Sequence, residues 1–270
     1  TIKTTGCLVV SCLLLLLAYG TYQAYRPIVR THSIHVDKEN KNYPTLRIVM
    51  ASDMHFGMLS GKKHATQLVQ EINALHADLV LFPGDIIDDD PTIFLQKNIG
   101  DTLSSIQSTL GVYAVMGNHD YYSDKTQVFL DEMKRIGIQM LLDETICIED
   151  SFYVMGRKDF SVKKRQTIDE LMKNVNPTLP MILLDHQPYA LDVLEANNID
   201  ISLSGHTHRG QMAPGQLITR RVFELDWGYK RKSSLHAFVS SGYGFWGPAI
   251  RIGSRCEILC IDVSFKQKNA

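Results

Sequence analysis

Five short apolar runs in this chain each end in a cluster of Asp, Asn or His side chains, and this repetition constrains the fold more than any other feature. Stretches with the spacing of amphipathic helices separate the runs, the first of them between Lys62 and His76. Such alternation predicts an α/β domain in which the runs are strands covered by helices. Ligands of open α/β sheets bind at the carboxyl ends of strands, so we expect the clusters to converge on one site. The runs cover residues 46–52, 78–82, 112–116, 181–185 and 199–204.

The clusters supply carboxylate, amide and imidazole groups but no thiolate, a set that suits hard to borderline divalent ions. Taken singly, such a residue is more often a helix cap or a structural histidine than a metal ligand. Together they exceed the four ligands of one tetrahedral zinc, and they suit two ions that share a bridging carboxylate. Glycines 84, 117 and 205 allow the sharp turns that such a site needs. The candidate ligands are Asp53, His55, Asp85, Asn118, His186, His206 and His208.

In chain order the clusters read DMH at 53–55, GDIID at 84–88, GNHD at 117–120, a single His186, and GHTH at 205–208. This pattern resembles the calcineurin-like metallophosphoesterases, whose blocks are DxH, GDxxD, GNHD, a separate His and GHxH. The resemblance implies a four-layer αββα sandwich with the site between the edges of two sheets. It also implies two divalent ions (Mn, Fe, Zn or similar), the first held by Asp53, His55 and His208, the second by Asn118, His186 and His206, with Asp85 bridging them.

The same resemblance implies catalytic roles for two neighbouring residues. His119 would face the phosphate and assist the leaving oxygen, Asp120 would orient His119, and a metal-bridging hydroxide would attack phosphorus. The block at 84–90 and the GNHD ending differ from the GDxVDRG and GNHE of protein Ser/Thr phosphatases, which argues against that activity. The closer likeness is to bacterial membrane-associated phosphodiesterases, some of which hydrolyse the pyrophosphate of UDP-2,3-diacylglucosamine.

The amino-terminal segment carries no formal charge from residue 4 to residue 25 and centres on a run of leucines. As a helix it is about 33 Å long, close to the hydrocarbon thickness of a bilayer. Its last tyrosines and Arg26 resemble an interfacial belt. We therefore predict a transmembrane helix over 1–25, a connector over 26–45 and the metallophosphoesterase domain over 46–270. The alternatives are a buried helix and a cleaved signal peptide, although no small-x-small cleavage site follows the leucines.

The charges that flank this segment predict its orientation in the cell membrane. Four basic residues lie between it and residue 45, against Lys3 before it, which favours a cytoplasmic catalytic domain. Because the chain begins at Thr1 and not at methionine, a fragment with further spans upstream is an open alternative.

The overall charge limits the class of partner. There are 28 Lys and Arg against 29 Asp and Glu, a net charge of -1 that argues against a protein built to coat nucleic acid. A basic stretch lies within 209–232, where Arg209, Arg220 and Arg221 are candidate substrate contacts and a solvated loop is the alternative. Phe245 and Trp246 are expected in the core, and a place in the lining of the substrate cleft is the alternative. We predict membrane lipid and a phosphoester substrate as partners, and nothing in the sequence identifies a protein partner.

These observations predict a membrane-anchored hydrolase of phosphodiester or pyrophosphate bonds that acts on a lipid-linked substrate. One alternative is a tethered phosphodiesterase or nuclease with soluble substrates. The other is a non-catalytic binding module that uses the metal site only for stability.

Overall fold

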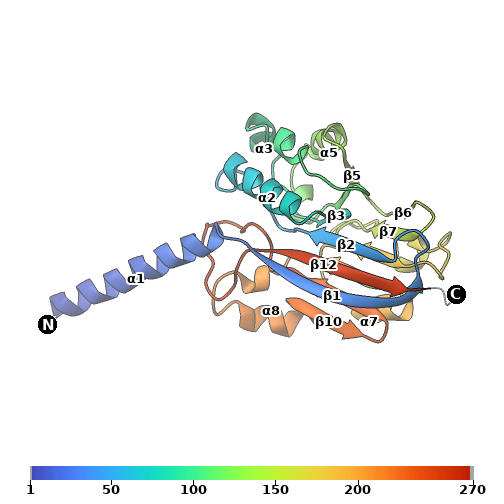
Figure 1. The fold of residues 1–270 in the computed structure, drawn as a ribbon. Helices are drawn as coiled ribbons and strands as arrows, with labels where there is room; N and C mark the ends of the chain where they lie inside the picture. Colours follow the sequence, from blue (N-terminus) through green and yellow to red (C-terminus); the bar gives the residue numbers. More distant parts are fainter. Residues whose placement is uncertain (1, 268–270) are drawn as a thin grey trace.

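The computed structural model describes residues 2–267, in which two sheets pack face to face between two layers of helices (Figure 1). In spatial order the first sheet contains β1 (Ile28–Glu39), β12 (Glu257–Lys266), β2 (Thr45–Met50), β3 (Leu79–Pro83), β4 (Val112–Val115) and β5 (Ile138–Met140). The second contains β10 (Gly228–Lys232), β11 (Leu235–Val239), β9 (Ile201–Ser204), β8 (Met181–Leu184), β7 (Phe152–Gly156) and β6 (Glu144–Ile148).

Helices cover the outer face of each sheet and complete the predicted αββα sandwich. On the first sheet lie α2 (Lys62–Ala74), α3 (Thr92–Gln96), α4 (Ile99–Leu103) and α5 (Thr126–Arg135), and the short helix η1 (His119–Tyr121) follows β4. On the second sheet lie α6 (Ile168–Leu171) and α7 (Leu191–Ala196). Two further elements, η2 (His208–Gly210) and α8 (Gln216–Val222), follow β9.

Of the strands that carry the motifs, β3 and β8 are apolar along their whole length because both of their faces are buried. β2 exposes Thr45 and Arg47 near its start, and β9 buries two serines. In β3, Leu79 and Leu81 join the core between the two sheets, whereas Val80 and Phe82 pack under the helices. The strands β2 to β5 run parallel, and so do β7, β8, β9 and β11. Their carboxyl ends therefore meet at one end of the sandwich, where loops can gather functional side chains.

The predicted connector over 26–45 is instead largely a strand of the first sheet. β1 runs parallel to β12 over most of its length, and Ile34 and Val36 enter the core between the sheets. Nearer its start the same face carries Arg30, which pairs with buried Glu257 at 2.6 Å, and His32, whose ring lies 5.2 Å from that of Phe238. Because polar residues occupy these inward positions, the alternation typical of a strand is not visible in the sequence. The packed domain thus begins with β1 at Ile28 and not at residue 46.

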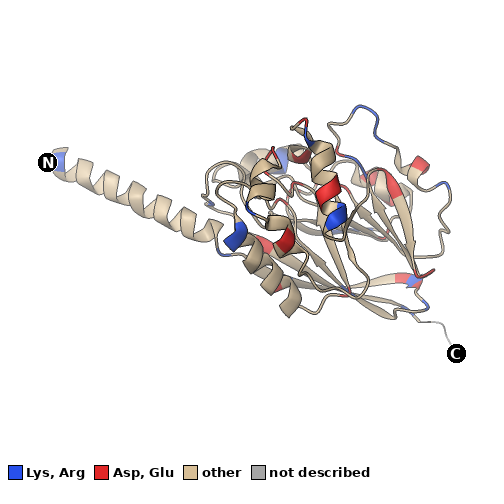
Figure 2. Ribbon diagram, turned by 90° about the horizontal axis from the view of Figure 1, so that it is seen from above, with Lys and Arg blue, Asp and Glu red and all other residues tan. Residues whose placement is uncertain are grey.

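The first helix, α1 (Ile2–Ala24), projects away from the domain (Figure 1). Among residues 2–267 it is the one helix that is long and apolar enough to cross a membrane. Figure 2 shows charge on α1 only near its amino-terminal end. Only Gly20 and Ala24 of this helix are buried, and the Gly20 carbonyl accepts a hydrogen bond from the backbone N–H of Arg251 at 2.9 Å. The carboxyl-terminal end of α1 is thus attached directly to the domain.

Candidate metal centre

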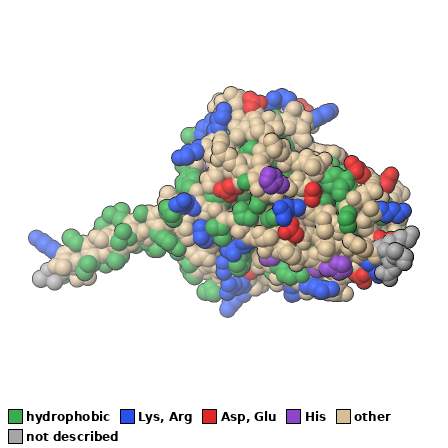
Figure 3. All heavy atoms as spheres, viewed as in Figure 1, with side chains coloured by type: hydrophobic (Ala, Val, Ile, Leu, Met, Phe, Trp, Pro, Cys, Tyr) green, Lys and Arg blue, Asp and Glu red, His purple; other side chains and the backbone are tan. Residues whose placement is uncertain are grey.

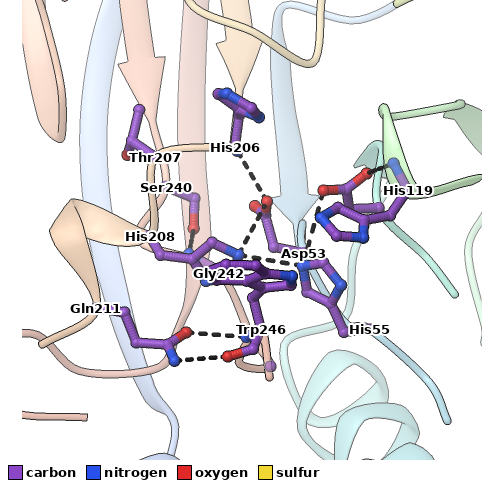
Figure 4. Close-up of polar contacts among 12 residues, drawn as sticks. Asp53, His55, His119, His206, Thr207, His208, Gln211, Ser240, Gly242 and Trp246 are labelled. Atoms are coloured by element: carbon purple, nitrogen blue, oxygen red, sulfur yellow. Dashed lines mark hydrogen bonds and ion pairs between the residues drawn. The ribbon is translucent and has the colours of Figure 1, made fainter. Parts of the chain in front are cut away.

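All seven predicted ligands lie close together where the strands end, and several of them are drawn in Figure 4. Asp53 and His55 follow β2, Asp85 follows β3, and Asn118 follows β4, all in the first sheet. His186 follows β8, while His206 and His208 follow β9, so both sheets contribute. The side chains meet between the edges of the two sheets, as the resemblance implied.

Asp53, His55 and His208 form the first group of ligands. One nitrogen or oxygen of each lies within 4.8 Å of the others, and all three side chains are buried. The Nε2 atoms of His55 and His208 are 3.1 Å apart, and the Nε2 of His208 is 3.6 Å from Asp53 Oδ1 (Figure 4). Imidazole and carboxylate atoms that face one another at this spacing can share a cation.

Asp85, His186 and His206 form a second group with the same spacing. Asn118 belongs beside it, because its Oδ1 lies 3.0 Å from the Nδ1 of His206. The Oδ2 of Asp85 is 3.1 Å from the Nε2 of His186 and 3.7 Å from the Nε2 of His55, a ligand of the first group. Asp85 therefore lies between the two groups, where a bridging carboxylate would be.

The orientation of His186 fits a metal ligand. Its Nδ1 donates to the carbonyl of Pro83 at 2.8 Å, which leaves the lone pair on Nε2. That buried Nε2 makes no hydrogen bond, although Asp85 Oδ2 is close. Burial alone would lower the pKa of His186, yet the Asp85 carboxylate raises this pKa well above its ordinary value, so the space between them attracts positive charge. A buried carboxylate with an unpartnered oxygen, as Asp53 has, also needs a cation.

The backbone that presents these ligands is strained. Asp53, His55, Asp85, His206 and His208 all have φ between 44° and 70°, the left-handed region that costs of order 1–3 kcal/mol for a residue with a side chain. Hydrogen bonds hold the strained turns: Asp53 N–H donates to the carbonyl of Gly84 at 3.0 Å, and His206 N–H to Asp53 Oδ1 at 2.8 Å. Such strain at five ligand positions indicates that the loops are shaped for this site.

Two glycines of the motif blocks allow the loops to approach the carboxylates. A Cβ at Gly117 would lie 2.1 Å from Asp85 Oδ1, and one at Gly205 would lie 2.1 Å from Asp53 Oδ2. Any side chain at either position would displace a ligand, which explains why the blocks contain glycine there. Taken together, the donor atoms, the burial and the close turns fit two divalent ions.

The predicted role of Asp120 as the partner of His119 is wrong. Asp120 is fully buried and accepts backbone N–H groups from Ile86 at 3.0 Å, Ile87 at 3.0 Å and Gly117 at 2.8 Å. It thereby ties together the loops after β3 and β4, and burial, followed by the Asp85 carboxylate, raises the pKa of Asp120 to about 7. Because η1 begins at His119, consecutive side chains there point in different directions.

The partner of His119 is Asp89, whose Oδ1 lies 2.5 Å from the ring Nδ1. Asp89 is the middle member of the acidic run 88–90, one of the residues that the block at 84–88 does not include. That run of three carboxylates is the sequence feature that points to a carboxylate partner for His119. The ring of His119 lies edge-on to that of His55 at 4.8 Å, in the wall of a cavity of about 380 Å³ beside the ligands.

Trp246 of the glycine-rich tail completes this cavity, together with residues that the motif blocks do not include. The expectation that Trp246 lies in the core is wrong, and the alternative position holds: it is 56% exposed and lines the cavity mouth together with Met212. Gln211 fixes the tryptophan loop, since its Nε2 donates to the Trp246 carbonyl at 2.7 Å and its Oε1 accepts the Trp246 N–H at 2.9 Å (Figure 4). Fully buried Arg251 lies behind the ligands, with Nη2 3.0 Å from the Nδ1 of His208.

The three arginines predicted as substrate contacts lie in η2 and α8, the elements that follow β9. Arg209 in η2 is half-buried, with its guanidinium 3.7 Å from the centroid of the Trp227 ring. Arg220 and Arg221 are exposed on α8, none of whose residues is buried. The cavity lining includes neighbouring residues of η2 but none of these three side chains, so their contact with substrate stays a prediction.

A family model described as calcineurin-like phosphoesterase matches residues 46–210, which contain every motif block. An uncharacterized metallophosphoesterase of Helicobacter pylori is 34% identical over 246 residues, covering 88% of this chain and 65% of that protein. A bovine (Bos taurus) transmembrane protein with metallophosphoesterase domain is 28% identical over 253 residues, covering 87% and 56%. The UDP-2,3-diacylglucosamine pyrophosphatase LpxG of Chlamydia muridarum is 23% identical over 215 residues, covering 62% and 65%. The chain thus spans about two thirds of these relatives or less.

Among solved structures, the protein TT1561 of Thermus thermophilus superposes with a TM-score of 0.51 at 13% identity. The superposition covers 74% of this chain and 89% of that protein, and it supports the fold alone. The family model covers more than half of the chain and contains all the loops that hold the ligands. This chain belongs to the calcineurin-like phosphoesterase family.

Proposed function

We propose that this chain is a membrane-anchored hydrolase of phosphodiester or pyrophosphate bonds that uses two divalent ions. The observation that carries the proposal is the position of Asp85 between two groups of buried ligands. Two ions at such a site activate water and neutralise charge on the phosphoryl oxygens. The names of the relatives as metallophosphoesterases support this chemistry.

The residues of the cavity wall supply the remaining groups that the reaction needs. His119 lines the cavity, and Asp89 accepts a hydrogen bond from its Nδ1–H, which supports the doubly protonated ring; in that form Nε2–H can donate a hydrogen bond or a proton to the leaving oxygen. Asp120 keeps the loop of Asp85 and the loop of Asn118 in register through its three backbone contacts. In this scheme His119 is the catalytic residue, and Asp89 and Asp120 are positioning residues.

The attachment of α1 favours a substrate that lies in the membrane. Arg251 connects α1 to the metal centre, because its backbone N–H donates to the Gly20 carbonyl of α1 while its side chain contacts the ligand His208. Trp246 and Met212 add an apolar rim to the cavity at the same end of the domain. We infer that the substrate is a lipid-linked phosphodiester or pyrophosphate, and the name of the chlamydial relative, a pyrophosphatase of a diacylated sugar nucleotide, supports this class.

Turnover of matched substrates tests the proposal. The full chain is reconstituted in liposomes, loaded with Mn²⁺, and offered a soluble diester, a monoester and a lipid-linked pyrophosphate. We expect chelator-sensitive hydrolysis that is fastest for the lipid-linked substrate. Faster turnover of the soluble diester would support the tethered phosphodiesterase or nuclease instead. Protein that holds two ions and hydrolyses none of the three would support the non-catalytic binding module.

The basic residues that follow α1 favour a domain on the cytoplasmic side of the cell membrane, and one cysteine offers a test. Cys147 is exposed on the domain, whereas Cys256 and Cys260 are buried. A membrane-impermeant maleimide should label Cys147 in lysed cells but not in intact cells. A Cys147→Ser chain is the control for labelling of cysteines in α1, and equal labelling of Cys147 in intact cells would place the domain outside.

A further inference from the structure

A second cavity, of about 770 Å³, lies where α1 meets the start of α2, and we refer to it as the junction cavity. Tyr25, which directly follows α1, lines it, and the hydroxyl of this tyrosine donates to the Leu59 carbonyl at 3.1 Å. The Tyr25 ring also lies edge-on to Phe245 at 5.2 Å. A helix that crosses a bilayer would therefore leave it at the junction cavity, at the level of the lipid headgroups.

The charged side chains that line the junction cavity are all cationic. They are Arg26, Lys62, Lys63 and Lys97, and no carboxylate is among the described lining residues. Lys97 donates to the Met58 carbonyl at 3.2 Å, but Lys62 and Lys63 are exposed and make no ion pair within residues 2–267. Figure 3 shows Lys and Arg side chains along the edge of the domain nearest α1. Unpaired cations gathered at one cavity attract an anion.

The start of α2 adds to this attraction. The helix begins at Lys62, its capping residue Gly61 offers no side-chain acceptor, and its first turn contains no acidic residue. The N–H groups of His64 and Ala65 donate to the Gly61 carbonyl at 2.9 and 3.1 Å, which leaves those of Lys62 and Lys63 at the start of the helix. Together with the helix dipole, these N–H groups favour a negative group. The same end of α2 thus presents both backbone donors and ammonium groups.

His64 provides a second, independent sign of a ligand. It is 4% exposed, lines the junction cavity, and leaves its buried Nε2 without a hydrogen-bond partner. Ser60 donates its hydroxyl to the Met54 carbonyl, so the Nδ1 of His64 donates to Ser60 and Nε2 is an acceptor. Burial, followed by the nearby Arg251 guanidinium, lowers the pKa of His64 to about 4, which keeps the ring neutral. Nε2 can therefore accept a hydrogen bond from a hydroxyl of a headgroup.

Apolar side chains at the rim distinguish a lipid from a free anion. Met58 and Leu59 line the junction cavity and are 69% and 55% exposed. Exposed apolar residues next to cations, beside a helix that crosses the membrane, match the boundary between headgroups and acyl chains. We propose that the junction cavity binds the phosphate headgroup of an anionic phospholipid in the leaflet at which α1 ends. This inference does not depend on the reaction proposed for the metal centre.

The test compares two double substitutions that remove the same charge. In Lys62→Gln/Lys63→Gln two of the four cations of the junction cavity are neutralised. In the control Lys163→Gln/Lys164→Gln an adjacent exposed pair in the loop before α6 is neutralised. The full chain is taken from micelles that contain equal phosphatidylglycerol and phosphatidylcholine, and native mass spectrometry counts the retained lipids. We expect the first variant to retain roughly tenfold less phosphatidylglycerol than the unaltered chain, and the control to match the unaltered chain.

Three results would overturn the proposal. Equal losses in the two variants would mean that net charge alone retains the lipid. Displacement of phosphatidylglycerol by equimolar inorganic phosphate would identify a free-phosphate site. Equal retention of phosphatidylcholine would show that the headgroup charge is not recognised. Melting temperatures of the variants check their folding, and none of these readouts requires enzymatic activity.

Discussion

The metal centre and the junction cavity lie at the same end of the domain, yet they are built in opposite ways. At the metal centre Asp53, Asp85 and His186 are buried, and backbone strain and hydrogen bonds fix the loops that carry them. At the junction cavity Lys62 and Lys63 are exposed on flexible stems, and neither makes an ion pair with another residue of the described range 2–267. The comparison teaches that a buried site depends on the exact atoms of each residue, whereas an exposed cationic site depends on summed charge. Substitutions at the first should therefore have much larger effects.

The largest effect is expected for Asp85→Ala, because this carboxylate faces ligands of both groups. Metal analysis should find that about two divalent ions per chain fall to one or none, and hydrolysis should fall below detection. Asp90→Ala is the matched control, since Asp90 contacts Thr92 and Lys125 instead of the ligands. Full ion content in Asp85→Ala would remove the basis for a shared bridging ligand.

The next largest effect separates chemistry from metal binding. His119→Ala should lower turnover by roughly 10²–10⁴-fold, the range for loss of a general acid. Its ion content should stay unchanged, because His119 lies in the cavity wall with Nδ1 held by Asp89. Turnover of a diester and metal content are measured on the same sample. If the ions are lost together with the activity, His119 is a ligand and the proposed division of roles is wrong.

Substitution of Asp89 should mainly lower turnover, whereas substitution of Asp120 should mainly lower the free energy of unfolding. Asp89→Asn weakens the support of His119 and should cost about 10–100-fold in turnover, with the free energy of unfolding changed by no more than about 0.5 kcal/mol. Asp120→Asn places an amide against buried N–H groups that need an acceptor, and should lower the free energy of unfolding by about 1–3 kcal/mol. Melting curves and turnover of both variants measure the contrast. The same loss of stability in both would contradict the roles that the hydrogen bonds indicate.

The motif-bearing half of the structure could be predicted because it rests on short local rules. Apolar runs buried on both faces, glycines in tight turns and polar residues at strand ends placed the seven candidate ligands, from Asp53 to His208, at one site. The parts that were missed depend on contacts between residues far apart in sequence. β1 is concealed because Arg30 pairs with Glu257 across the sheet, and Arg251 reaches His208 only through the fold. Similarly, the cations of the junction cavity come from three separate segments.

The smallest effect is expected in the basic stretch 209–232, where the structure separates two kinds of cation. Lys230 and Lys232 of β10 pair with Glu224, whereas Arg220 and Arg221 on α8 make no ion pair within residues 2–267. Arg220→Gln/Arg221→Gln should therefore lower turnover of a vesicle-borne substrate by about threefold to tenfold, with turnover of a soluble diester unchanged. Lys230→Gln/Lys232→Gln should leave both rates unchanged, because these charges are already neutralised on the surface. Rates on the two substrates, measured at low and high salt, distinguish the pairs. If the arginine variant loses turnover equally on both substrates, the arginines contact the phosphoester itself. If the lysine variant loses as much turnover on vesicles as the arginine variant does, the ion pairs with Glu224 do not decide which cations reach the membrane.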